Sequence, residues 1–300
     1  MGVRTFSRRW IGPGPDGRPR PRAAYALPTL FTAGNVFLGF LSIMRSVQGA
    51  LLAASAASGA TGPNPHFEVA AVAIGWAVVL DGLDGRIARL TNTVSDFGRE
   101  MDSLADVIAF GIAPAVLAFA WGVQLAIGSA DPVYHDHLRR LGFFVPFLFL
   151  LCGAARLARF NVQKNPVPKN PGRPDRKYFV GLPIPAAAAL VAAIVYASGG
   201  APILVWPLML GWLGLLAVLS FLMISTWRYQ SFKDVQLLRP RSWLIFVLWG
   251  SIIYLLWIYT PPVLLAITSV YVASGIAVRI GGIVRRRLRH APPEPERQLG

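Results

Sequence analysis

The residues best suited to chemistry lie within positions 81–106, which hold six of the 14 acidic residues of the chain. Asp81 and Asp84 are three residues apart, and Asp102 and Asp106 are four apart, so each pair would share one face of a helix. A short turn between the two helices would make them antiparallel neighbours and bring the two faces together. Four converging carboxylates form an oxygen-rich cage that cannot stay ionised without cations, and Mg²⁺ or Mn²⁺ suits such ligands.

Long apolar segments must position these acids. Of the 300 residues 54% are hydrophobic and only 14% are charged, against a usual charged share of about 25%. This composition excludes an ordinary soluble surface and a disordered chain. A membrane-spanning helix needs roughly 20 apolar residues. The sequence predicts an all-α, polytopic membrane bundle of eight helices, at about 27–55, 67–90, 97–128, 139–161, 180–199, 201–225, 242–259 and 261–284.

The distribution of basic residues indicates how the chain crosses the membrane. The formal net charge is +15, but Lys and Arg occur in short clusters between apolar segments, which favours lipid headgroups over nucleic acid as the partner. Loops rich in Lys and Arg alternate with loops that have few or none. We therefore expect a protein of the cell (inner) membrane whose two termini and acid pairs face the cytoplasm. Arg139 and Arg140 depart from this alternation, and Arg45 lies inside the first predicted span, where only snorkelling would accommodate its charge.

Composition divides the chain into three parts. A basic, Pro-rich arm occupies residues 1–26, the transmembrane domain occupies 27–284, and a basic, Pro-rich tail occupies 285–300. The one cysteine, Cys152, excludes a disulfide framework.

The acids are also compatible with a structural role or with transport. They could form a structural charge network with Arg86, Arg89 and Arg99, or they could line the ion pathway of a transporter. The position of the acids near one membrane face, with glycines that admit a bulky ligand, favours an enzyme site.

Residues 81–106 read DGLDGRIARLTNTVSDFGREMDSLAD. This segment resembles the signature of the CDP-alcohol phosphatidyltransferases, a D-x₂-D-G-x₂-A-R stretch followed by G-x₃-D-x₃-D. The resemblance implies a helical membrane bundle whose acids bind two divalent ions and a cytidine diphosphate lipid. The matching positions are Asp81, Asp84, Gly85, Ala88, Arg89, Gly98, Asp102 and Asp106.

Within this family the flanking segments resemble those of the phosphatidylserine synthases. The resemblance implies transfer of the phosphatidyl group from CDP-diacylglycerol to the hydroxyl of L-serine, with release of CMP. Glycerol 3-phosphate and inositol phosphate are the alternative acceptors, and Val107 stands where users of glycerol phosphate commonly have Lys. The resembling segments are LPTLFTAGNVFLGFLSI (27–43), SDFGREMDSLADVIAFGIAPA (95–115), RLARFN (156–161), YFVGLPIPAAA (178–188) and SFKD (231–234).

Roles for single residues follow from the motif and from the chemistry. We expect Asp81, Asp84, Asp102 and Asp106 to bind the metal ions, and Asp106 also to act as the general base for the serine hydroxyl. Because Arg is the natural partner of a carboxylate, Arg156 and Arg159 are candidates for binding serine. Resemblance to family members also suggests a homodimer. The candidate residues for the CDP-lipid are Asn35, Gly85, Ala88, Arg89, Ser95 and Gly98.

Overall fold

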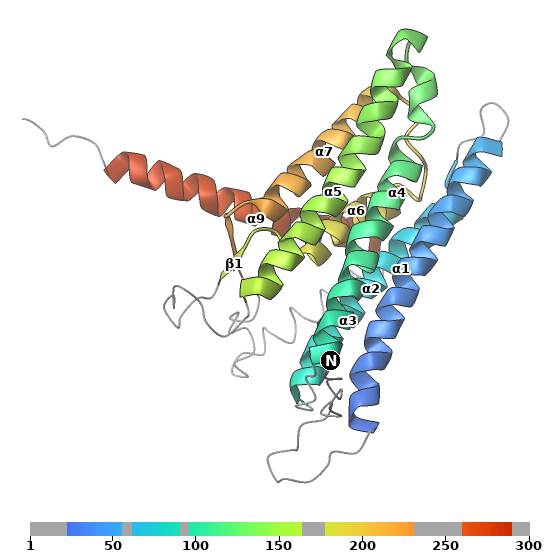
Figure 1. The fold of residues 1–300 in the computed structure, drawn as a ribbon. Coiled ribbons are helices and arrows are strands. Elements are labelled where there is room, and N and C mark those ends of the chain that lie inside the picture. Colours follow the sequence, from blue (N-terminus) through green and yellow to red (C-terminus); the bar gives the residue numbers. More distant parts are fainter. Residues whose placement is uncertain (1–22, 56–61, 91–95, 164–177, 231–259, 290–300) are drawn as a thin grey trace, which may run out of the picture.

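The computed structural model describes residues 23–55, 62–90, 96–163, 178–230 and 260–289. Within these ranges the chain is a bundle of helices (Figure 1), as the sequence predicts. The α-helices are α1 (Ala23–Ser55), α2 (Pro65–Leu90), α3 (Asp96–Asp106), α4 (Ala113–Gly122), α5 (His135–Gln163), α6 (Ile184–Ala197), α7 (Trp206–Ile224) and α9 (Thr260–Arg289). The shorter elements are a π-helical turn η1 (Val107–Ile112), two 3₁₀ turns η2 (Ala126–Ser129) and η3 (Pro132–Tyr134), and strands β1 (Tyr178–Val180) and β2 (Arg228–Gln230).

Most of the predicted membrane spans are present. Within the described ranges, six helices are long and apolar enough to cross a membrane, which makes the chain a membrane protein. They cover Leu30–Ser55, Pro65–Asp84, Phe97–Ser129, Pro132–Val162, Trp206–Ile224 and Thr260–Ala277.

The prediction of eight full spans differs from the structure at one helix. The helix expected over 180–199 is the 14-residue α6, about 21 Å long at 1.5 Å per residue and short for a hydrocarbon core of ~30 Å. The helix is short because β1 pairs with the distant strand β2 and Pro183 is extended before the helix begins. The span expected over 242–259 lies outside the described residues.

A capped start fixes α2. The Asn64 side chain accepts a hydrogen bond from the His66 backbone N–H at 3.1 Å and donates to the Gly49 carbonyl of α1 at 3.0 Å. Pro65 follows as the first helical residue, where its missing N–H costs nothing. This cap joins α1 to α2 at the end away from the acid cluster.

The structure also explains Arg45, which the sequence places inside a span without a polar partner. Its Nη1 donates to Gln48 Oε1 at 3.3 Å and lies 3.3 Å from His66 Nδ1 on α2. The guanidinium is therefore satisfied by neighbouring side chains.

Packing in the bundle combines small residues with a few large aromatics. Helix α1 lies along α2, α3 and α4, while α5 packs on α7, and α6 on α2 and α9. The Trp212 indole donates to the Ala118 carbonyl at 3.0 Å and meets Trp121 edge-on at 5.0 Å. A side chain at Gly122 would collide with Trp212, so α4 and α7 approach closely there. Such close contacts replace the hydrophobic driving force that is absent between helices in lipid.

Gly200 provides a test of this packing. It has a φ of +68°, and a Cβ there would collide with the Asn64 carbonyl oxygen at the start of α2. A non-glycine residue in the left-handed region costs about 1–2 kcal/mol before any collision. We therefore expect Gly200→Ala to lower the free energy of unfolding by about 2 kcal/mol or more, measured by thermal unfolding in detergent. Gly211→Ala is the control, because its Cβ would enter open space, and it should unfold like the parent.

Candidate active site

Three of the predicted metal ligands meet in the structure. Asp81 comes from α2, and Asp102 and Asp106 come from α3. One carboxylate oxygen from each lies within 4.8 Å of the others. All three side chains are half-buried, within or beside the spans Pro65–Asp84 and Phe97–Ser129. Helices α2 and α3 thus present facing carboxylates, as their spacing predicts.

This acid cluster, Asp81 with Asp102 and Asp106, has the chemistry of a divalent cation site. Hard oxygen ligands suit Mg²⁺ and Mn²⁺, and carboxylates at membrane depth repel one another unless a cation neutralises them. Asp106 Oδ1 is buried and has no hydrogen-bond partner among the described residues. A buried polar atom left without a donor is costly. The acid cluster could therefore hold a metal ion, with Asp106 Oδ1 available as a ligand atom.

Asp84, the fourth predicted ligand, is held by α1. It is only 8% exposed, and its Oδ2 accepts a hydrogen bond of 2.8 Å from the Thr32 hydroxyl. It interacts electrostatically with Asp81 and Asp106. Asp84 therefore lies close to the acid cluster, with one oxygen engaged by Thr32.

Helix α1 also brings Asn35 to this region. Asn35 follows Thr32 by three residues and so lies on the same helix face. Its side chain is 2% exposed, and Oδ1 has no hydrogen-bond partner within the described part of the chain. Gly39 allows this approach of α1, because a Cβ added there would lie only 2.9 Å from the Ala109 backbone.

The helix geometry changes directly after Asp106. The six residues of η1 form a π-helical turn before α4 begins. Pro114 lies four residues after Phe110, where its ring would clash with the Phe110 carbonyl in a regular α-helix. The wider π turn relieves this clash. Such π turns are frequent at functional sites, and here the turn lies between the acid cluster and the buried core.

One arginine of α5 adjoins the acid cluster, and a second lies beside that arginine. Arg156 is half-buried and interacts electrostatically with Asp106, Arg159 and Tyr271. Its Nε is buried without a hydrogen-bond partner among the described residues. Arg159 donates from Nη1 to the Ile224 carbonyl of α7 at 3.3 Å. The site therefore places an available guanidinium donor beside the carboxylates.

The end of α5 is tied to α3 by one short hydrogen bond. Asn161 Nδ2 donates to Ser103 Oγ at 2.7 Å, and Ser103 Oγ donates to the Arg99 carbonyl at 3.0 Å. Ser103 is the neighbour of Asp102, so this bond holds the arginine-bearing turn of α5 against the helix that carries two of the acids.

Tyr271 is a site residue that sequence reasoning missed. It lies on α9, far along the chain from the acidic motif, and is half-buried against Arg156. No spacing rule connects a lone tyrosine in an apolar span to a motif on α2 and α3. Only the packing of α9 against α6 reveals it.

The remaining candidates lie around the turn between α2 and α3. Gly85, Ala88 and Arg89 belong to the last turns of α2, and Ser95 lies outside the described residues. Gly98 is half-buried on α3. Their assignment to the CDP-lipid stays a prediction.

Comparison with known proteins agrees with the acid cluster. The family model of CDP-alcohol phosphatidyltransferases matches residues 25–227, which include every helix from α2 to α7. The chain belongs to this family. The match confirms the resemblance drawn from residues 81–106. Helix α9 and Tyr271 lie beyond the matched residues.

The similar proteins belong to the serine branch of the CDP-alcohol phosphatidyltransferases. The chain is 38% identical over 212 residues to the CDP-diacylglycerol–serine O-phosphatidyltransferase of Helicobacter pylori, covering 71% of this chain and 75% of the relative. It is 41% identical over 162 residues to the enzyme of that name from Saccharomyces cerevisiae, covering 54% and 50%. It is 35% identical over 176 residues to the archaetidylserine synthase of Methanothermobacter thermautotrophicus, covering 58% and 59%.

The acid cluster makes a direct prediction about metal binding. Asp102→Asn should weaken Mn²⁺ binding, measured by electron paramagnetic resonance of free Mn²⁺, because it removes a charge from the three-carboxylate group. Loss of even an outer-shell partner typically costs about 10–100-fold in metal affinity, so at least that loss is expected.

Glu100→Gln is the matched control, because Glu100 is exposed on the same helix and lies outside the acid cluster. Equal Mn²⁺ affinity for the two variants would show that bulk negative charge, and not the acid cluster, binds the ion.

Proposed function

We propose that the chain transfers the phosphatidyl group of CDP-diacylglycerol to the hydroxyl of L-serine, giving phosphatidylserine and CMP. The observation that carries this proposal is the proximity of Arg156 to Asp106, which sets a cationic group beside the acids of the family motif. The names of the similar proteins, CDP-diacylglycerol–serine O-phosphatidyltransferases, support the same donor and acceptor.

The donor is proposed to bind between α1 and the acid-bearing helices. Asp81, Asp84, Asp102 and Asp106 would hold divalent ions, Mg²⁺ or Mn²⁺, with two ions as the proposed number. When bound, such cations neutralise the pyrophosphate and the departing CMP. The buried, unpartnered Oδ1 of Asn35 would accept a hydrogen bond from the cytosine amino group. The other proposed contacts to the CDP-lipid are Gly85, Ala88, Arg89, Ser95 and Gly98.

Asp106 is proposed as the general base. Its carboxylate accepts the proton of the serine hydroxyl as the serine oxygen bonds to the phosphorus and the bond to CMP breaks. Position suits this role, because Oδ1 has no competing hydrogen bond among the described residues and Arg156 lies nearby. A positioned base typically contributes 10²–10⁴-fold to the rate.

The serine carboxylate is proposed to bind Arg156, with Arg159 at the next turn of α5. Two neighbouring guanidinium groups repel each other, and an anionic ligand between them relieves that repulsion. The interaction of Tyr271 with Arg156 would help to hold the guanidinium toward the acceptor. An inositol phosphate or glycerol 3-phosphate acceptor would instead bring a phosphate to these arginines, and this is the alternative within the family.

The setting of this reaction is proposed as the cytoplasmic face of the cell (inner) membrane, in a homodimer. The charge alternation of the loops supports the orientation.

Release of labelled CMP from membranes, measured with L-serine, glycerol 3-phosphate and inositol phosphate in turn, tests the acceptor. Release only with serine is the expected result. If vesicles that contain the protein take up cations and no acceptor causes CMP release, the result would instead favour a transporter.

Asp106→Asn separates catalysis from folding. Turnover per folded molecule should fall by about 10²–10⁴-fold or more, because the variant lacks the base. The melting temperature in detergent should hold or rise, since one charge leaves a mutually repelling group. A structural charge network would give the reverse pattern, with a lower melting temperature and near-normal turnover.

Arg156→Gln tests the acceptor site. We expect the KM for serine to rise by about tenfold or more, because a charge-assisted bond to the carboxylate is lost, while the KM for CDP-diacylglycerol changes little. Arg140→Gln, an exposed arginine at the other end of α5, is the control. An equal rise in both KM values would assign Arg156 to the donor.

A further inference from the structure

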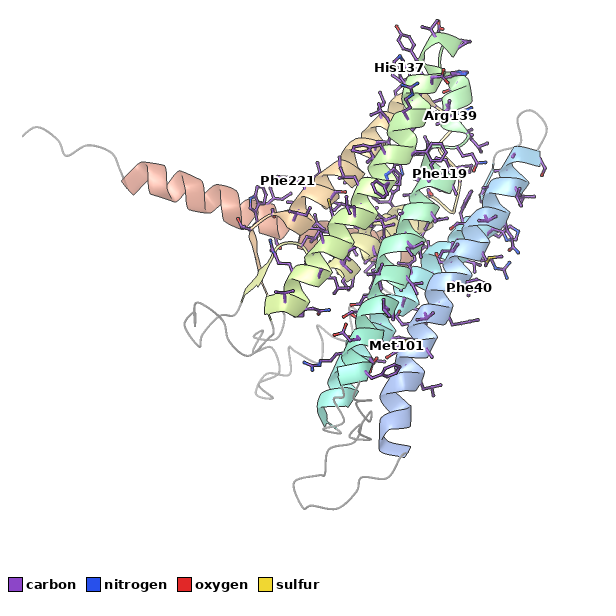
Figure 2. All side chains as sticks on the ribbon, viewed as in Figure 1. Phe40, Met101, Phe119, His137, Arg139 and Phe221 are labelled. Carbon is purple, nitrogen blue, oxygen red and sulfur yellow. The ribbon has the colours of Figure 1, made fainter. Side chains whose placement is uncertain are left out.

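A second candidate site lies at the opposite end of the bundle. Figure 2 shows Phe119 and Arg139 near one end of the helices and Met101, the neighbour of Asp102, near the other. A cavity of about 380 Å³ at the first end is bordered by residues of α4, η2 and α5. This volume lies within the range of small-ligand sites, about 300–1,000 Å³.

The cavity is positively charged. Arg139 is the only Lys or Arg among its lining residues, which include no carboxylate. The nearby Asp131 engages its own turn, with Oδ1 accepting from the Val133 backbone N–H at 2.9 Å. Within the described residues Arg139 has no such partner. Arg139 and Arg140 are also the two bases that break the charge alternation of the loops.

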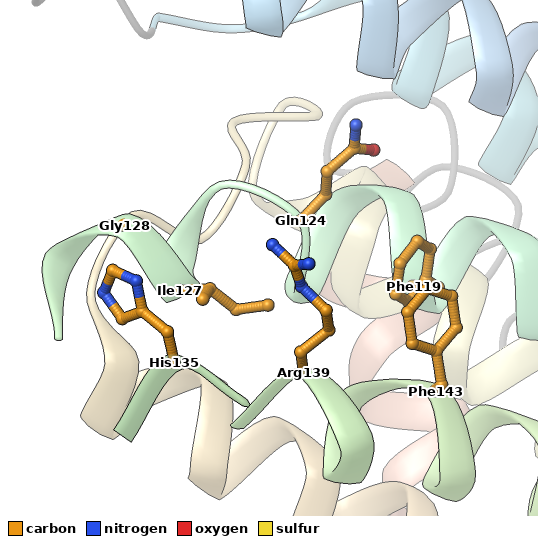
Figure 3. A pocket seen from close by; sticks show the side chains of 7 residues that line it. All are labelled: Phe119, Gln124, Ile127, Gly128, His135, Arg139 and Phe143. Carbon is orange, nitrogen blue, oxygen red and sulfur yellow. The ribbon is translucent and has the colours of Figure 1, made fainter. Parts of the chain in front are cut away.

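One neutral donor, the Gln124 amide, completes the polar side of the cavity. Figure 3 shows the Arg139 guanidinium between Ile127 and the ring of Phe119, with the Gln124 side chain above it. His135 Nε2 lies 3.0 Å from the Ala130 carbonyl, which can only accept, so this nitrogen carries a proton and the ring is held in place. An Arg with an amide beside it is suited to a phosphate, which accepts charge-assisted hydrogen bonds.

An apolar strip continues from the cavity along α5. Phe143 and Phe147 follow Arg139 at spacings of four residues, so the three side chains lie on one helix face. Phe143 stacks on Phe119 with ring centres 4.7 Å apart, and Phe143 and Phe147 are 57% and 54% exposed. A cationic group at the membrane interface followed by exposed aromatics matches a headgroup followed by an acyl chain.

We propose that this cavity binds the phosphate of an anionic phospholipid from the leaflet opposite the acid cluster, with an acyl chain along Phe143 and Phe147. The net charge of the lining residues selects an anionic over a zwitterionic lipid. Arg139 and Arg156 are 17 residues apart on α5, about 25 Å along a helix. The lipid is therefore distinct from the donor and acceptor of the proposed reaction.

The test is a lipid titration of the purified full-length chain followed by native mass spectrometry. Phosphatidylglycerol should bind at least about tenfold more tightly than phosphatidylcholine. Arg139→Gln should weaken phosphatidylglycerol binding by about tenfold, the usual effect of losing a charge-assisted bond. Arg140→Gln, an adjacent arginine that does not line the cavity, should stay within about twofold of the parent.

A second pair of variants tests the cavity without changing charge. Gly128 lines the cavity and a Cβ there would meet no atom within 4 Å, nor would one at Gly75 on the exposed face of α2, outside the cavity. Gly128→Leu should therefore block the phospholipid, whereas Gly75→Leu should not. Release of CMP with serine, measured at saturating substrate, should be retained in all four variants, because none of the changed residues lies at the acid cluster; this release shows that the variants are folded.

Three outcomes would overturn the proposal. Equal losses in Arg139→Gln and Arg140→Gln would mean that general surface charge attracts the lipid. Equal binding of phosphatidylcholine and phosphatidylglycerol would remove the role of Arg139 in selection. Displacement of phosphatidylglycerol by millimolar inorganic phosphate would identify a site for a soluble anion instead of a lipid.

Discussion

The mutual repulsion of three carboxylates at membrane depth is the constraint on which the site depends. Asp81, Asp102 and Asp106 have ligand atoms within 4.8 Å of one another, and like charges at such separations are costly outside water. The surrounding structure offsets only part of this cost, through Arg156 beside Asp106. Cations bound at the acid cluster would lower this cost, so their binding would stabilise the folded chain.

Close helix packing keeps the acids in place despite this repulsion. Gly39 lets α1 lie against the backbone at Ala109, one turn beyond Asp106. The same helix supplies Thr32 to Asp84 and Asn35 to the buried interior. Helix α1 therefore acts as a rigid support that carries polar contacts, and any widening of its contact with η1 would loosen the ligands.

Sequence reasoning predicted the parts of this site that obey local rules. Spacings of three and four residues placed Asp81 and Asp84 on one face and Asp102 and Asp106 on another, and apolar length predicted the helices. It did not predict η1 or the β1–β2 pair, because both depend on how distant segments meet. The short α6 was missed for the same reason. Apolar composition continues through residues 178–183, but residues 178–180 pair with residues 228–230, and the Gly181 and Leu182 N–H groups donate to the Trp227 and Leu222 carbonyls.

The residues around the site fall into two groups, those within the family signature and those outside it. The acids lie on α2 and α3, within the segment of the family signature, and in the proposed reaction they bind the cytidine diphosphate part of the donor. Arg156 and Arg159 lie outside the signature, and Tyr271 lies beyond the residues that match the family at all. A donor common to the family needs a common motif, whereas different alcohols need different contacts. We therefore expect acceptor choice to reside in α5 and α9.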